Sequence, residues 1–265
     1  MNVLITGAAS GIGNEVKNYF IKENHNVIAL DIKKIEEINE YLISYDVDIT
    51  NEDKLNKIKE ELINRKIKFD MIINIAGIHK MASLVESDYE MMKKVIDINL
   101  CGTMLVNKVF YDLLNHSGRI VIVTSEVASF DPMPFNSLYN ISKTALDCYA
   151  QGLRQELNLL NQKVITIRPG AVETALSSNS LSDTEYLANN TILYHKQANK
   201  FLNLVKKFMG KPIKAEKMAK FIYKKSIKNR PRLIYQKHRN FGLVLLNILP
   251  KRLQCFIIKS LLNSK

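Results

Sequence analysis

The chain alternates between short apolar runs and longer stretches in which apolar residues recur at helical spacing. The apolar runs have the length and composition of buried strands and lie at residues 2–6, 27–31, 71–75, 119–124 and 163–168. The helical stretches between them lie at residues 11–23, 52–64, 88–115 and 139–161. Strands that alternate with helices pair in parallel, because each helix carries the chain back to the start of the next strand. We therefore expect an α/β fold with a doubly wound parallel sheet.

Length and composition fit a single main domain. The chain has 265 residues, 46% of them apolar, and no internal repeat or low-complexity linker divides it. We expect this domain to cover residues 1–235 and a basic amphipathic tail to cover residues 236–265. The first strand starts at residue 2, which leaves no room for a signal peptide and favours a cytoplasmic protein.

A glycine-rich turn follows the first strand. Gly7, Gly11 and Gly13 lie between that strand and the next helical stretch. Glycine lets a backbone approach a pyrophosphate closely, and a helix N-terminus offers unpaired N–H groups to the anion. The spacing differs from the commoner dinucleotide fingerprint, so a purely structural turn is the alternative. The pattern favours a nucleotide site on a Rossmann-type sheet.

An acidic residue ends the second predicted strand. Asp31 follows the glycines by roughly 20 residues, from where a carboxylate can accept hydrogen bonds from an adenosine ribose. Because a carboxylate repels a 2′-phosphate, we expect NAD rather than NADP as the cofactor. Lys33 and Lys34 weaken this expectation, and Asp31 could instead simply end a strand in solvent.

A tyrosine and a lysine offer candidate proton chemistry. Tyr139 and Lys143 are four residues apart, which places them on one helical face, and Ser125 lies fourteen residues before the tyrosine. A tyrosine phenol has a pKa near ~10, and a nearby ammonium favours its ionised form. We therefore expect Lys143 to lower the pKa of Tyr139. Taken alone, a Tyr/Lys pair at this spacing is more often a surface pair.

Together these segments resemble the short-chain dehydrogenase/reductase family, specifically its "classical" branch. The likeness covers roughly residues 1 to 175, and it includes Asn74-Ile75-Ala76-Gly77, which resembles the family's Asn-Asn-Ala-Gly motif with one substitution. The residues that the resemblance implies as cofactor contacts are Gly7, Ser10, Gly11, Ile12, Gly13, Asp31, Asp48, Ile49, Asn74, Ala76, Gly77, Tyr139, Lys143, Pro169, Gly170, Val172 and Thr174.

The resemblance also implies a catalytic set of Asn99, Ser125, Tyr139 and Lys143. In this family's mechanism Tyr139 exchanges a proton with the substrate oxygen while hydride moves between carbon and nicotinamide. Ser125 donates a hydrogen bond to that oxygen. Lys143 lowers the tyrosine pKa and binds the nicotinamide ribose, and Asn99 holds a water that relays protons.

The chain departs from the family pattern in two places. One additional residue separates the serine from the tyrosine, and Glu126 follows Ser125 where a small residue is commoner. Neither departure removes a catalytic group. We expect the loop over residues 127–138 to bulge.

Net charge is divided unevenly along the chain. Residues 196–265 hold nineteen Lys and Arg against the single acid Glu216, a net charge of +18, whereas residues 1–195 sum to −6. So much positive charge could attract nucleic acid, but no recognised binding motif accompanies it, and we expect no such partner.

The same basic region contains two apolar stretches, at residues 241–249 and 253–262. Each is too short to span a membrane. The pattern predicts a helix that lies on an anionic membrane surface. The alternatives are a cap on the substrate pocket or a dimer contact. The residues of the second stretch that share one helical face are Leu253, Phe256, Ile257 and Leu261.

The remaining chemistry is limited. Cys101, Cys148 and Cys255 are odd in number and far apart, which fits reduced thiols better than disulfides. The five histidines show no metal-ligand spacing, so we expect no metal.

The substrate is expected to be lipophilic. The segment 174–210 lies where the family places its substrate lid, and Met133 and Phe135 either line the same pocket or belong to the core. The segment 231–235, with its Pro-Arg-x-x-Tyr pattern, resembles family members that act on steroids, retinoids and other lipophilic alcohols. The apolar residues of the lid are Leu176, Leu181, Tyr186, Leu187, Ile192 and Phe201.

The resulting hypothesis is an NAD(H)-dependent oxidoreductase that interconverts an alcohol and its carbonyl near a membrane. A 3-oxoacyl carrier-protein reductase could use the basic tail to dock an acidic carrier, although such enzymes usually favour NADP. A nucleotide-sugar epimerase has a different glycine spacing, and a non-catalytic NAD-binding scaffold would not need the Ser/Tyr/Lys set. Family habit implies a homodimer or homotetramer built on the helices at 88–115 and 139–161.

Overall fold

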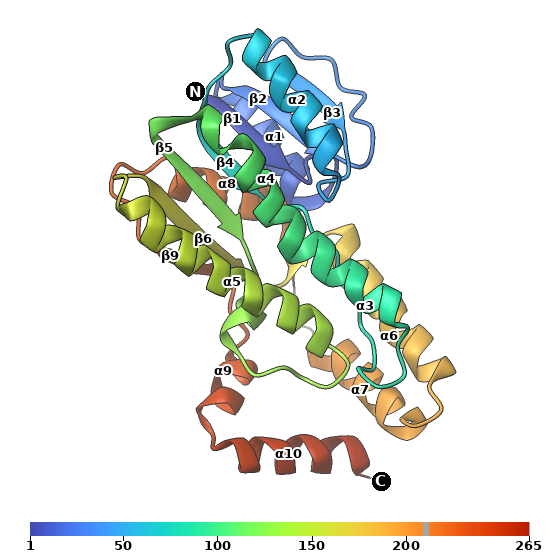
Figure 1. Ribbon diagram of the computed structural model, residues 1–265. Helices are drawn as coiled ribbons and strands as arrows, with labels where there is room; N and C mark the ends of the chain where they lie inside the picture. Colours follow the sequence, from blue (N-terminus) through green and yellow to red (C-terminus); the bar gives the residue numbers. More distant parts are fainter. Residues whose placement is uncertain (209–211, 265) are drawn as a thin grey trace.

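The computed structural model describes residues 1–208 and 212–264, without the side chains of residues 175–178 and 207–208. Within this part of the chain, seven parallel strands form one sheet in the order β3-β2-β1-β4-β5-β6-β9 (Figure 1). The expected doubly wound sheet is confirmed. The strands are β1 (Asn2–Thr6), β2 (Asn26–Asp31), β3 (Leu42–Asp46), β4 (Phe69–Asn74), β5 (Leu114–Val123), β6 (Lys163–Pro169) and β9 (Ile234–Lys237).

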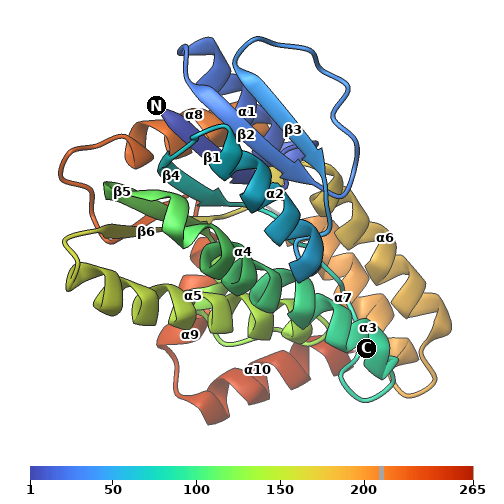
Figure 2. The same ribbon diagram turned by 45° about the horizontal axis from the view of Figure 1, so that its top comes forward.

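Helices cover both faces of this sheet (Figure 1 and Figure 2). A short parallel pair, β7 (Val172–Glu173) and β8 (Ile213–Lys214), stands apart from it. The helices are α1 (Gly11–Lys22), α2 (Glu52–Asn64), α3 (Tyr89–Ile96), α4 (Thr103–Phe110), α5 (Ser137–Asn158), α6 (Ala175–Asn190), α7 (His195–Phe208), α8 (Ala215–Ser226), α9 (Phe241–Ile248) and α10 (Lys251–Asn263).

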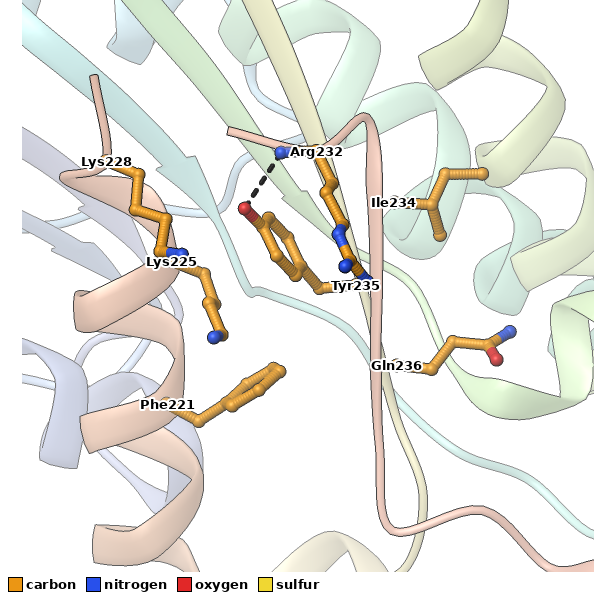
Figure 3. Close-up of a pocket in the computed structure, with 7 residues that line it drawn as sticks. All are labelled: Phe221, Lys225, Lys228, Arg232, Ile234, Tyr235 and Gln236. Atoms are coloured by element: carbon orange, nitrogen blue, oxygen red, sulfur yellow. Dashed lines mark hydrogen bonds between the residues drawn. The ribbon is translucent and has the colours of Figure 1, made fainter. Parts of the chain in front are cut away.

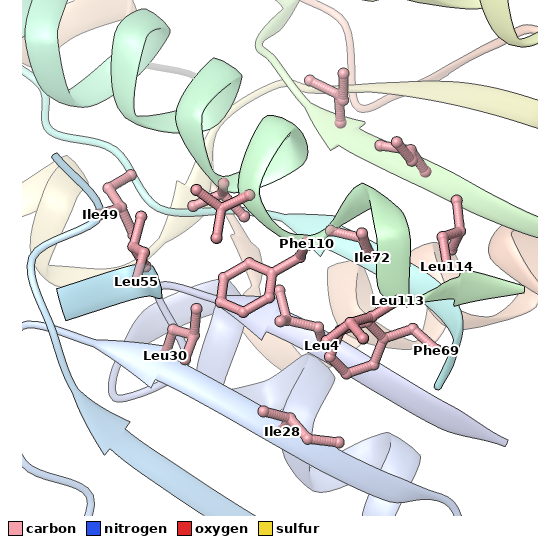
Figure 4. Packing of buried hydrophobic residues seen from close by; sticks show 14 of the residues in the cluster. Leu4, Ile28, Leu30, Ile49, Leu55, Phe69, Ile72, Phe110, Leu113 and Leu114 are labelled. Carbon is pink, nitrogen blue, oxygen red and sulfur yellow. The ribbon is translucent and has the colours of Figure 1, made fainter. Parts of the chain in front are cut away.

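Alternate residues of the central strands supply the two halves of the core. Leu4 of β1 joins the cluster under α2, α4 and α5, where Phe110 packs edge-on against Phe69 (Figure 4). Val3 and Ile5 of the same strand point to the other face, under α1 and α8. Successive side chains of a strand point to opposite faces, so a strand with helices on both sides is apolar throughout. This explains why the central strands were recognisable as continuous apolar runs.

Two strands of the sheet were not predicted. In β3 no residue is fully buried, and the strand lies at one edge, so its sequence lacks a continuous apolar run. β9 forms the other edge and buries only Tyr235. Gln236 and Lys237, the first two residues of the predicted tail, belong to β9.

The helix predicted over 88–115 is not continuous. A π-helical turn at Asp97–Gly102 separates α3 from α4, and the chain already enters β5 at Leu114. At Gly102 an added Cβ would lie 2.8 Å from the Ile49 side chain, so glycine permits this close approach. The turn is the irregular segment that carries Asn99 into the site.

Candidate active site

The glycine turn is held by close backbone contacts. Gly7 and Gly11 have φ angles of +71° and +53°, a region that favours glycine. An added Cβ would lie 2.8 Å from the Ala76 backbone at Gly7 and 2.0 Å from the Gly7 carbonyl oxygen at Gly13. α1 begins at Gly11 after Ser10, with Ile12 in its first turn. The strand, turn and helix therefore have the arrangement that binds a pyrophosphate.

Asp31 connects the end of β2 to this turn. Its Oδ2 accepts a hydrogen bond from the Ala9 N–H at 2.9 Å, and its Oδ1 accepts one from the Lys33 N–H at 2.9 Å. The residue is 9% exposed, so the interpretation that it ends a strand in solvent is wrong. Each carboxylate oxygen can accept a further hydrogen bond, for instance from a ribose hydroxyl. Lys34 points outward and pairs with Glu36.

The segment after β4 is fixed to the glycine strand. Thr6 Oγ1 accepts hydrogen bonds from the N–H groups of Ile75 at 3.1 Å and Ala76 at 3.2 Å. Asn74 is buried and donates to Asn107 Oδ1 at 2.9 Å. These bonds position the backbone of the Asn-Ile-Ala-Gly segment beside Gly7.

The predicted adenine contacts have different environments. Asp48 accepts hydrogen bonds from the N–H and hydroxyl of Thr50, which keeps it in a turn near the surface. The Ile49 side chain is buried in the core and packs against Gly102. Ile49 can therefore approach a nucleotide only through its backbone.

Asn99 organises the backbone next to Lys143. Its Oδ1 accepts from the Ile78 N–H at 2.7 Å, and its Nδ2 donates to the Ile78 carbonyl and to Ser142 Oγ, both at 2.9 Å. An added Cβ at Gly77 would lie 2.9 Å from Asn99 Oδ1 and 3.2 Å from Lys143 Nζ. The Asn99 side chain is thus engaged in fixing residues 77 and 78. The predicted role in a water relay stays a prediction.

Tyr139, Ser125 and Lys143 meet as predicted. Tyr139 and Lys143 are both buried in α5, and the lysine Nζ lies 5.8 Å from the centre of the tyrosine ring. The Tyr139 phenol shares a hydrogen bond with the Ser125 side chain, which follows β5. A phenol that could transfer a proton and a hydroxyl that could bind a substrate oxygen are therefore adjacent.

The electrostatics of this group differ from the prediction. Burial raises the pKa of Tyr139 to about 12, and the hydrogen bond from Ser125 offsets this only in part. Burial also lowers the pKa of Lys143 to about 8. The expectation of a lowered Tyr139 pKa is wrong for this structure, because desolvation outweighs the other effects and disfavours the charged form of both groups.

His79 is a member of the site that its sequence did not reveal. Its ring centre lies 4.4 Å from that of Tyr139, and its Nε2 hydrogen-bonds Asn136 Oδ1 at 3.0 Å. Its buried Nδ1 has no hydrogen-bond partner among the described residues. Burial, and then the Lys143 charge, lower its pKa, so the ring stays neutral at neutral pH. The available signal was its place two residues after Gly77, at the carboxyl end of β4.

Glu126 connects the site to the C-terminal segment. Its Oε2 accepts a hydrogen bond from the Asn240 N–H at 2.7 Å, and burial raises its pKa. Next to it, Gly170 donates to the Lys237 carbonyl at 2.8 Å, and an added Cβ there would lie 1.7 Å from the His238 carbonyl oxygen. The unusual residue after Ser125 thus anchors the chain between β9 and α9.

The segment after β6 returns to the glycine turn. Pro169 ends β6, and Val172 is buried in β7. The Thr174 methyl group lies 3.1 Å from the position that a Cβ would occupy at Gly11. The predicted residues at the ends of β1, β2, β4, β5 and β6 therefore converge at the carboxyl edge of the sheet, where ligands of doubly wound sheets bind.

The predicted lid segment forms α6 and α7, and only part of its apolar residues are buried. Leu187 and Phe201 are buried in a cluster with Phe135, against which Met133 packs, whereas Leu181 is half-buried. Both loop residues, Met133 and Phe135, therefore pack against the lid. Two other predicted lid residues, Tyr186 and Ile192, are 68% and 90% exposed. The Leu176 side chain and Met209 lie outside the described residues.

Comparison with known proteins agrees with this geometry. A family model described as short chain dehydrogenase matches residues 1–185. An NADPH-dependent 1-acyldihydroxyacetone phosphate reductase from Schizosaccharomyces pombe is 34% identical over 202 residues, which cover 72% of this chain and 67% of that protein. A 3-oxoacyl-[acyl-carrier-protein] reductase from Thermotoga maritima is 31% identical over 185 residues, which cover 66% of this chain and 75% of that protein.

Similarity extends to solved structures. A crystal structure of a short chain dehydrogenase family protein from Francisella tularensis has a TM-score of 0.72 and 26% sequence identity. The match covers 89% of this chain and 96% of that chain. The order of strands and helices is therefore shared along most of both molecules.

Proposed function

This chain belongs to the short-chain dehydrogenase family of nicotinamide-dependent oxidoreductases, and we propose that it interconverts a lipophilic alcohol and its carbonyl. The observation that carries this proposal is the convergence of Tyr139, Ser125 and Lys143 beside the glycine turn. A bound nicotinamide would supply or accept the hydride. The residues of this chain would bind the substrate oxygen and move its proton.

The protonation states favour carbonyl reduction. With a pKa of about 12, Tyr139 is protonated at neutral pH and can donate its proton to a carbonyl oxygen. With a pKa of about 8, Lys143 is mostly an ammonium at the same pH and can stabilise the phenolate that remains. Ser125 is close enough to donate to the same substrate oxygen. Reduction therefore starts from the protonation states that the structure favours.

The apolar surroundings support a lipophilic substrate. The lid packs on the loop before α5 through Phe135, whose ring centre lies 5.5 Å from that of Tyr194 and 5.4 Å from that of Phe201. The S. pombe relative is named as a reductase of 1-acyldihydroxyacetone phosphate, and this name supports the same substrate class. The T. maritima relative favours a second candidate, reduction of a 3-oxoacyl carrier protein.

A substrate screen tests this function. We expect NADH oxidation, followed by its absorbance, with long-chain acyl ketones, steroid ketones or retinal, and little with sugars. Faster turnover of a 3-oxoacyl carrier protein than of any free lipid ketone would favour the second candidate. An absence of turnover with every carbonyl and reduced dinucleotide, and with every alcohol and oxidised dinucleotide, despite dinucleotide binding, would contradict an enzymatic role and favour a scaffold.

We propose NAD(H) as the preferred cofactor because of Asp31. A negative charge held at the end of β2 opposes a 2′-phosphate, although the S. pombe relative is named as NADPH-dependent. Asp31→Asn keeps an oxygen that can accept from the Ala9 N–H but removes the charge. We expect it to shift the ratio of kcat/KM from NADH toward NADPH by roughly tenfold or more, since a like-charge contact is lost.

The matched control for this variant is Glu60→Gln, which removes one exposed negative charge from α2. It should leave the cofactor ratio unchanged. A wild-type protein that already prefers NADPH, or an Asp31→Asn variant with the wild-type ratio, would show that Asp31 does not set the preference.

A homodimer or homotetramer stays a prediction. A hollow of about 1010 Å³ lies along α4 and α5, and its lining includes Leu105, Tyr111 and Leu153. Met104 and Leu160, which also line it, are 43% and 57% exposed. Apolar surface of this kind supports a subunit contact on the two helices that family habit implies.

A further inference from the structure

The two C-terminal helices each have an apolar side that nothing in the described chain covers. On α9, Phe241, Leu245 and Ile248 are 79%, 67% and 74% exposed. Their spacing of four and then three residues places them on one helical face. On α10, Leu253 and Phe256 are 43% and 66% exposed and share a face in the same way. We call these five side chains the tail surface.

The opposite side of the tail is fixed to the body of the protein. Gln254 and Leu262 are buried in α10, and Leu262 belongs to the apolar cluster of the lid. Asn247 of α9 accepts a hydrogen bond from the Asp131 N–H at 2.6 Å. Gln197 of α7 donates to Asn263 Oδ1 at 2.6 Å. The tail is therefore a docked element with an inner face that packs and an outer face that does not.

The two faces of the tail bear on the alternatives that the sequence left open for residues 241–262. Capping of the pocket and contact with a membrane were alternatives, yet the inner face of α10 packs on the lid while the outer face stays exposed. The two views of the molecule show α9 and α10 along one edge, with the lid beside them (Figure 1 and Figure 2). No helix in the described chain could cross a bilayer, so contact with a membrane would be along its surface.

Positive charge accompanies the tail surface. Arg239, Arg252 and Lys259 are exposed on or next to the two helices, and no acidic residue follows Glu216 in the sequence. Arg239 lies over the Phe130 ring at 5.5 Å, which holds it near the start of α9. Apolar side chains flanked by exposed cations are complementary to a bilayer that contains anionic lipid.

Not all of the excess charge lies at this edge. Lys225, Lys228 and Arg232 line a separate hollow of about 320 Å³ beside β9, together with Phe221 and Tyr235 (Figure 3). Lys225 lies 5.3 Å and 5.4 Å from the centres of the Phe221 and Tyr235 rings. Of the large apolar side chains that line that hollow, Ile234 is 37% exposed, whereas the tail surface exposes five.

We propose that the tail surface docks this protein on an anionic lipid bilayer, with α9 and α10 lying in the plane of the interface. The lid would then lie next to the membrane, because α7 contacts the end of α10. Ile192 and Leu193, just before α7, are 90% and 64% exposed. This inference goes beyond the proposed hydride transfer and does not depend on it.

Vesicle flotation tests the docking surface directly. We expect the full-length protein to float with vesicles of phosphatidylglycerol and phosphatidylcholine in equal parts at low ionic strength. It should float poorly with phosphatidylcholine alone, and less with the mixed vesicles at high salt, because salt screens the attraction. The double variant Phe241→Ser with Leu245→Ser should bind the mixed vesicles roughly tenfold or more weakly, since two apolar side chains no longer enter the interface.

A control variant separates this effect from a general loss of surface hydrophobicity. Ile38 and Leu159 are 99% and 82% exposed and lie outside the tail, so Ile38→Ser with Leu159→Ser should float like the wild type. All four changed side chains are exposed, and dinucleotide binding reports that each variant is folded. Failure of the wild type to float with mixed vesicles at low salt would overturn the proposal. So would an equal loss in the control variant, or a tail variant that changes only self-association.

Discussion

Replacement of Tyr139 by phenylalanine should reduce turnover by roughly 10³-fold while leaving dinucleotide binding nearly unchanged. The phenol is the group that shares a hydrogen bond with Ser125 and can exchange a proton with a substrate oxygen. Removal of a general acid typically costs ~10²–10⁴ in rate. The phenylalanine ring can keep the packing against His79, so the site should retain its shape.

The measurement compares kcat with the dissociation constant of NADH, read from its fluorescence. Tyr149→Phe is the matched control, because it removes a hydroxyl from the same helix, one that accepts a hydrogen bond from Asn107. It should keep most of the activity. Wild-type turnover by Tyr139→Phe would rule out the proposed proton transfer, whereas loss of both turnover and NADH binding would point to a structural defect.

Replacement of Lys143 by methionine should have opposite effects on activity and stability. Burial lowers the pKa of Lys143 from 10.5 to about 8, so folding places a charged group in an unfavourable environment at neutral pH. Methionine removes that charge at similar length. We expect the free energy of unfolding near pH 7 to rise by about 3 kcal/mol. Turnover should fall by roughly 10²-fold or more, because no ammonium remains to stabilise the phenolate.

The pH dependence of stability follows from the two pKa values of Lys143. Between the folded pKa of about 8 and the unfolded value of 10.5, the unfolded state binds more protons at Lys143. Stability therefore increases with pH between these two values. The penalty for burying the Lys143 ammonium is absent above the unfolded pKa and reaches its full size as pH falls through the folded pKa. The stability difference between Lys143→Met and the wild type should be largest below about pH 8 and should narrow as pH rises toward about 10.

Burial of Tyr139 has the opposite effect on the pH dependence of stability, and it acts at higher pH. Its folded pKa of about 12 exceeds the ordinary value of 10.0, so its contribution to stability is fully present below pH 10 and is lost as pH rises from 10 to about 12. Denaturant unfolding of the wild type and of Lys143→Met, near pH 7 and near pH 10, measures how the stability difference between them narrows. The control is Lys220→Met, at an exposed position of α8. A Lys143→Met protein that is less stable than the wild type near pH 7 would contradict the interpretation.

The central sheet and its nucleotide turn were predictable because their signals are local. Leu4 and its neighbours in β1 form a continuous apolar run, and Gly7, Gly11 and Gly13 follow at a spacing that only a tight turn satisfies. The edge strands β3 and β9 were missed for the complementary reason. They bury few side chains, and backbone pairing rather than side-chain pattern places them in the sheet.

That Ser125 and Lys143 lie near the Tyr139 phenol could be predicted from the sequence, but the burial of these groups could not. Their spacing resembles that of a known family, and the structure brings them together. His79 and Glu126 gave no comparable signal, since each acts through a partner distant in sequence: Asn136 and the Tyr139 ring in one case, Asn240 in the other. The interruption at Asp97–Gly102 was also hidden, because it depends on what Asn99 bonds across the fold.

By itself the sequence determined the alternation of strands and helices, the glycine turn, and the tyrosine and lysine on one helical face. Each of these depends on residues within a few positions of one another. Only the tertiary structure decided the direction in which the pKa of Tyr139 is shifted and which face of α10 remains exposed. Both follow from burial, and burial depends on segments that are far apart in the chain and meet only after folding.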